Sequence, residues 1–60
     1  MQQELIFKVV SVGKIDEVLI LDTNPSIARA VYGVAVELLP QEWIELRQGT
    51  SVVEVSKQSP

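Results

Sequence analysis

The residue types that most often carry catalysis or bind transition metals are missing from this chain. It has no cysteine and no histidine among its 60 residues. This absence removes thiol nucleophiles, the imidazole general base and zinc sites of the Cys/His kind. The hydroxyl side chains have no histidine to activate them, and no lysine stands at a spacing that suggests a Ser-Lys pair. Gly13, Gly33 and Gly49 stand singly, so they form no phosphate-binding fingerprint.

Carboxylates remain, and two pairs of them stand close together in the sequence. Asp16 and Glu17 are adjacent, which is typical of a solvated turn. Glu42 and Glu45 lie in a stretch compatible with a helix, where they would share a face and complement the dipole of the first turn. Neither pair fits the spacing of a calcium loop, and a chain this short rarely encloses a substrate cleft. We therefore expect no enzyme, no metal site and no cofactor.

The charge balance disfavours a partner rich in phosphate. Five lysines and arginines stand against eight aspartates and glutamates, for a net charge of -3. A single chain therefore repels nucleic acid overall. An oligomer could still bring Lys8, Lys14 and Arg29 onto one face, so nucleic-acid binding stays open as an alternative.

Charged residues interrupt every long apolar stretch of the sequence. No segment reaches the roughly 18 uncharged apolar residues that a membrane-spanning helix needs. The opening residues carry no base, and no small-residue cleavage site follows them. We expect a soluble, cytoplasmic protein without a membrane partner.

The apolar patterning predicts a β-rich chain. Leu5 to Val12 and Glu17 to Leu21 predict two strands, which form a hairpin through the turn at Gly13 and Lys14. The turn residues from Asp22 to Pro25 end the second strand. Thr50 to Ser56 predicts the final strand.

The segment that follows Pro25 fits two structures. Alternating apolar residues, with a high β-branched content and Gly33, favour a strand from about Arg29 to Leu38. The alternative is a helix over about residues 26–39, capped by Asn24 and started by Pro25. The apolar stripe of that helix would consist of Ile27, Val31, Val34 and Leu38.

Residues 40–48 predict a short helical turn, because Pro40 suits a first helical position and Gly49 a left-handed cap. Together the elements predict a mainly β domain, in which four strands form a small sheet or barrel with one helical turn packed against it. We expect residues 1–56 to form this single domain and residues 57–60 to be a frayed tail.

One stretch of the sequence matches a known pattern. Tyr32 to Val55 combines an apolar strand, a Leu-Pro step with a short helix, and a strand led by glycine. In this it resembles swapped-hairpin AbrB-like regulators and addiction-module antitoxins over less than half of the chain. The residues that fit are Pro40, Trp43, Leu46, Gly49 and Val52. The resemblance implies a domain-swapped homodimer that binds operator DNA, with Lys8, Lys14 and Arg29 as its contacts.

The small size of the domain indicates self-association. Apolar burial contributes roughly 90 kcal/mol to folding and chain ordering costs about the same, so a lone chain has little surplus. The predicted strands are apolar on both faces, and a second copy is the simplest cover for the second face. We expect a small acidic interaction module, acting as an adaptor, inhibitor or accessory subunit, that forms a homodimer or higher oligomer and binds another protein. Its interface would centre on Phe7, Tyr32, Trp43 and Ile44.

Overall fold

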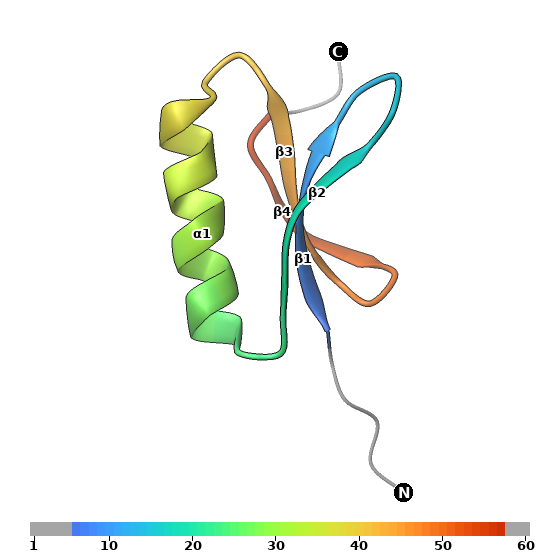
Figure 1. The fold of residues 1–60 in the computed structure, drawn as a ribbon, viewed down its shortest axis with the longest axis vertical. Coiled ribbons are helices and arrows are strands. Elements are labelled where there is room, and N and C mark those ends of the chain that lie inside the picture. The colour runs from blue at the N-terminus through green and yellow to red at the C-terminus, as the bar shows by residue number, and fades with distance from the viewer. Residues whose placement is uncertain (1–5, 58–60) are drawn as a thin grey trace, which may run out of the picture.

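The computed structural model describes residues 6–57, which form an antiparallel sheet covered on one side by a helix (Figure 1). The elements follow in the order β1 (Phe7–Val12), β2 (Glu17–Asp22), α1 (Pro25–Leu38), β3 (Trp43–Gln48) and β4 (Ser51–Val55). The predicted β-rich domain with a four-stranded sheet is confirmed. The predictions for residues 1–5 and 58–60, Leu5 as a strand start and most of the frayed tail included, lie outside the described residues.

The strands lie in the order β2-β1-β3-β4, and all neighbours are antiparallel. The predicted hairpin of the first two strands is confirmed, and β1 and β3 form the centre of the sheet. Both edge strands contain one extra residue relative to their neighbour, Leu19 in β2 and Val53 in β4. Such bulges increase the local twist of an edge strand.

The favoured strand from Arg29 to Leu38 is wrong, because this segment is the C-terminal part of helix α1. The alternative helix is the one observed. It begins as its start signals predict: the Asn24 side chain accepts hydrogen bonds from the amides of Ser26 at 2.8 Å and Ile27 at 3.3 Å, and Pro25 occupies the first turn. Within the described part of the chain, no helix has the length and apolar character needed to cross a membrane.

The core lies between α1 and the two central strands. Ala28 and Ala35 of the helix are buried against Val9, Ile44 and Leu46 of the sheet. Phe7, Ile20, Val31, Tyr32 and Val36 are partly buried around this cluster. Small alanine side chains let the helix backbone approach the sheet closely, and this close packing outweighs the β propensity of the valines in α1.

The predicted helical turn over residues 40–48 is also wrong. A turn at residues 40–42 leads directly into β3, where Ile44 and Leu46 point into the core. Trp43, Glu45 and Arg47 alternate with them on the other face. Gly49 does adopt a positive φ of 60°, but in the tight turn between β3 and β4 instead of at a helix end. The strand forms because its alternation fits the middle of a sheet, whatever its helix propensity.

Candidate interaction surfaces

Helix α1 exposes most of the apolar stripe that its sequence predicts. We call Ile27, Val31, Val34 and Leu38 the outer seam. Val31 is half-buried against the core, but Ile27, Val34 and Leu38 are 46%, 53% and 73% exposed. The core uses the neighbouring stripe of alanines instead, so the apolar sector of α1 is wider than the part that the sheet covers. Exposed apolar area of this kind is typical of a surface that contacts a partner.

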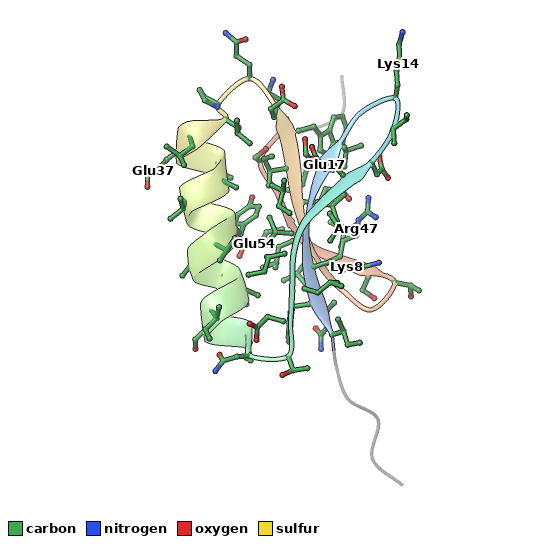
Figure 2. All side chains as sticks on the ribbon, in the orientation of Figure 1. Lys8, Lys14, Glu17, Glu37, Arg47 and Glu54 are labelled. Carbon is green, nitrogen blue, oxygen red and sulfur yellow. The ribbon has the colours of Figure 1, made fainter. Side chains whose placement is uncertain are left out.

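The sheet has an open face on the side away from α1. Its cross-strand rows follow from the strand register: Leu21, Lys8, Arg47 and Val52 form one row, and Val18, Val10, Glu45 and Val55 form the next. Exposed apolar residues of β2 and β4 flank this face, and charged residues occupy its middle. Figure 2 shows Lys8 and Arg47 on the side of the sheet opposite α1.

A polar network ties the open face together. The Trp43 Nε1–H donates to Glu45 Oε2 at 3.0 Å, and Arg47 Nε donates to Glu45 Oε1 at 2.8 Å. The Arg47 guanidinium also lies 3.7 Å from Asp16, in the loop between β1 and β2. Because the Glu45 side chain is only 12% exposed, this network fixes the Trp43 ring and the Arg47 head group in place.

The two edge strands offer a different kind of surface. All residues of β4 are exposed, and in β2 only Ile20 and Asp22 are half-buried. The outward backbone groups of an edge strand can pair with another chain. At the Asp22 end of β2, a shallow hollow of about 380 Å³ is lined by Ile6, Leu21, Asp22 and Thr23.

No known protein family, curated protein or solved structure matches the chain.

The residues predicted for an interface take different places in this geometry. Ile44 is fully buried beneath α1, so it has no surface to offer a partner, and its assignment is corrected. Phe7 and Tyr32 are half-buried at the margin of the core. Trp43 is half-buried on the open face, held by Glu45. A role of these three aromatic residues at an interface stays a prediction.

Tyr32 lies close to an ion pair that joins α1 to β4. Arg29 Nη1 and Glu54 Oε2 are 2.9 Å apart, and both side chains are well exposed. Burial, together with the nearby Glu54 carboxylate, raises the pKa of the Tyr32 phenol above its usual 10.0. Figure 2 shows Glu54 on the side of the sheet that faces α1.

The basic residues predicted for nucleic-acid contact are not brought together in one chain. Lys8 lies on the open face in β1, and Lys14 lies in the loop that leads to β2 (Figure 2). Arg29 lies on α1, where it pairs with Glu54.

The predicted pairs of carboxylates do not form a site either. Glu42 and Glu45 were expected to share a helix face, which is wrong because Glu42 precedes β3 and Glu45 belongs to it. Glu42 instead accepts a hydrogen bond from the Ser11 hydroxyl at 3.2 Å. Asp16 and Glu17 are exposed around the start of β2, as expected of a turn. Residues 6–57 contain no group of three or more acidic side chains placed to hold a metal ion.

The elements implied by the AbrB-like resemblance differ from those observed. Its first strand falls in α1, and its short helix falls in the turn and β3. Sequence patterning predicted a second, uncovered sheet face but missed the strand order and the two bulged edges, because these depend on pairing between segments that are distant in the sequence. The outer seam was predicted as the apolar stripe of the alternative helix, without an assignment of what it faces.

Proposed function

We propose that the protein is a non-catalytic protein–protein interaction module that works as a homo-oligomer, with the outer seam of α1 as its self-association surface. The exposed seam is the observation that carries this proposal. Three of its four residues are exposed, and α1 packs against the sheet through the neighbouring stripe that contains Ala28 and Ala35 (Figure 1). A partner would remove this apolar area from water, which a lone chain leaves exposed.

The seam is complementary to itself when two helices run antiparallel. A register that sets Val31 opposite the partner's Val34 also sets Ile27 opposite the partner's Leu38, because both pairs share one midpoint. Each seam residue then meets an apolar side chain. The spacing of the seam, which alternates between four and three residues, is that of helices that pack at a shallow crossing angle.

The non-catalytic part of the proposal is supported by the chemistry of the side chains. The chain lacks cysteine and histidine. Glu45 and Glu54 are engaged with Arg47 and Arg29. An adaptor, inhibitor or accessory subunit needs a surface of defined shape, and the four-stranded sheet provides one.

Light scattering behind size exclusion tests the proposal. We expect the parent protein at micromolar concentration to have a multiple of its 6.7 kDa chain mass. Val34→Lys places a charge in the middle of the seam, so it should return the mass to 6.7 kDa while circular dichroism stays unchanged. Glu37→Lys is the matched control, because Glu37 is exposed on the same helix outside the seam.

Two outcomes would contradict the proposal. A folded parent that keeps the monomer mass over the whole concentration range would exclude a homo-oligomer. An oligomer that Val34→Lys and Glu37→Lys leave equally intact would place the contact on some surface other than the seam.

A further inference from the structure

Strand β2 forms one edge of the sheet and combines apolar character with acidic ends. It pairs with β1 on one side, and within residues 6–57 no strand pairs with its other side. Val18, Leu19 and Leu21 are exposed along it, at 49%, 38% and 60%. Glu17 begins the strand and Asp22 ends it. The edge therefore presents unpaired backbone groups between two carboxylates.

These carboxylates disfavour a second copy of the chain at this edge. Antiparallel pairing of β2 with itself over its full length sets Glu17 opposite the partner's Asp22 at both ends. Parallel pairing in register sets each acid opposite itself. Like charges directly opposite in a sheet are destabilising, so the strand selects against its own copy in these two registers, which pair the strand over its full length.

The same carboxylates favour an extended segment with basic ends. We propose that the β2 edge accepts such a segment from another protein by strand addition: backbone pairing along β2, apolar side chains beside Leu21, and a lysine or arginine near Glu17 and near Asp22. This inference rests on the proposed function as a protein–protein interaction module, but it uses a surface separate from the outer seam. Main-chain pairing supplies affinity in this mode of recognition, and side-chain contacts supply specificity.

Two further features locate the contact along β2. The hollow lined by Ile6, Leu21, Asp22 and Thr23 lies at the Asp22 end and has space for an apolar side chain of the segment. The bulge at Leu19 divides the strand, so Ile20 to Asp22 forms a regular run next to this hollow. We therefore place the centre of pairing on that run.

Synthetic peptides of defined sequence test the inference. The probe is a capped peptide of alternating valine and threonine with lysines at both ends, and its matched control carries glutamates in place of the lysines. A third peptide keeps the lysines but has N-methylated amides on alternate residues, which removes strand pairing without changing charge. Binding is measured by titration calorimetry at low and at high salt. We expect the lysine peptide to bind about tenfold more tightly than the glutamate peptide, and the N-methylated peptide to lose binding.

Charge reversal in the protein provides the reciprocal test. The double variant Glu17→Lys and Asp22→Lys should prefer the glutamate peptide, and Glu37→Lys should keep the preference of the parent. Because the Asp22 carboxylate accepts the Asn24 amide at 2.7 Å, Glu17→Lys alone is measured as well, and it should weaken the preference without altering the fold.

Three results would overturn the inference. If no peptide binds the folded parent, then Glu17, Asp22 and the bulge at Leu19 prevent strand addition at β2 instead of supporting it. Equal binding of the N-methylated and unmodified lysine peptides would show charge attraction without strand addition. An unchanged preference in the double variant would place the peptide elsewhere. None of these results alters the oligomeric mass, so the proposed function is judged separately.

Discussion

Glu45 organises the open face of the sheet, since its two carboxylate oxygens accept from Trp43 and Arg47. It lies in β3, directly opposite Val10, which is 1% exposed. Val10 does not belong to the cluster under α1, so the side chains of the open face must cover it. The network therefore contributes packing as well as hydrogen bonds.

Trp43→Phe tests the contribution of this network. The change keeps an aromatic ring but removes the Nε1–H donor, which leaves a largely buried carboxylate oxygen without its partner. We expect the free energy of unfolding to fall by about 1 to 2 kcal/mol, measured by urea denaturation followed by circular dichroism. The same substitution in a Glu45→Gln background should have a smaller effect, because the charged acceptor is gone. Equal effects in both backgrounds would assign the loss to packing of the ring alone.

Tyr32 gives the protein a dependence on alkaline pH. Since burial and Glu54 raise the pKa of its phenol in the folded state, the fold favours the neutral phenol. The stabilisation this provides is complete below the unfolded pKa of about 10 and is lost as pH rises through the folded pKa. Tyr32→Phe should therefore lose less stability than the parent between neutral pH and pH values above the usual tyrosine pKa. The measurement compares urea midpoints of both proteins across that range, which cancels the titration of the lysines. If the urea midpoints of the two proteins change with pH in parallel, the alkaline pH dependence does not come from Tyr32.

Within the secondary-structure elements and their turns, two of the three glycines have opposite effects on stability. Gly33 lies in the interior of α1, and a Cβ added there would meet no atom within 4 Å. Gly49 lies in the turn between β3 and β4, where its φ of 60° is one that residues with a Cβ rarely adopt.

Alanine at these two positions should have effects of opposite sign. Gly33→Ala should raise the free energy of unfolding by about 0.5 to 1 kcal/mol, because alanine restricts the unfolded chain and fits the helix. Gly49→Ala should lower it by about 1 to 2 kcal/mol, because the left-handed conformation is strained for alanine. Thermal or urea unfolding of both variants measures the difference. A stabilising Gly49→Ala would show that the turn is not held in this conformation.

At the scale of the whole molecule, folding and association are coupled in the proposed homo-oligomer. A protein stabilised by its own copies has a melting temperature that rises with concentration. We expect a rise of about 3 to 6 °C for each tenfold increase in concentration, given the thermal response of a domain of this size. Val34→Lys should melt at a temperature independent of concentration, and Glu37→Lys should behave as the parent does. A parent whose melting temperature does not change with concentration would speak against coupling.

The placement of the described surfaces makes the molecule two-sided. The outer seam lies on α1, and the β2 edge and the open face belong to the sheet. In the proposed arrangement, an apolar and uncharged seam accepts a second copy, and an edge with acidic ends accepts a basic segment. The two surfaces select different partners because of their charge. The outer seam has no charged residue, whereas the β2 edge has an acidic residue at each end.

Features that depend only on neighbouring residues could be predicted from the sequence. It predicted the hairpin of β1 and β2 and the final strand, and its alternative for residues 26–39 contained the cap at Asn24. It also predicted a left-handed Gly49, although as a helix cap, because turn chemistry and strand alternation are local properties. It also supplied the apolar stripe of α1.

The choice between helix and strand over Arg29 to Leu38, and again over residues 43–48, was made by tertiary packing. Both segments carry patterns that fit either state, so the choice depended on the face that each had to cover. The sheet needed a helix on one side, and Ala28 and Ala35 could approach it closely. Residues 43–48 form the central strand beside β1, because Ile44 and Leu46 give this strand a buried apolar face. The same packing left Ile27, Val34 and Leu38 of the outer seam exposed, because the sheet covers the stripe that contains Ala28 and Ala35.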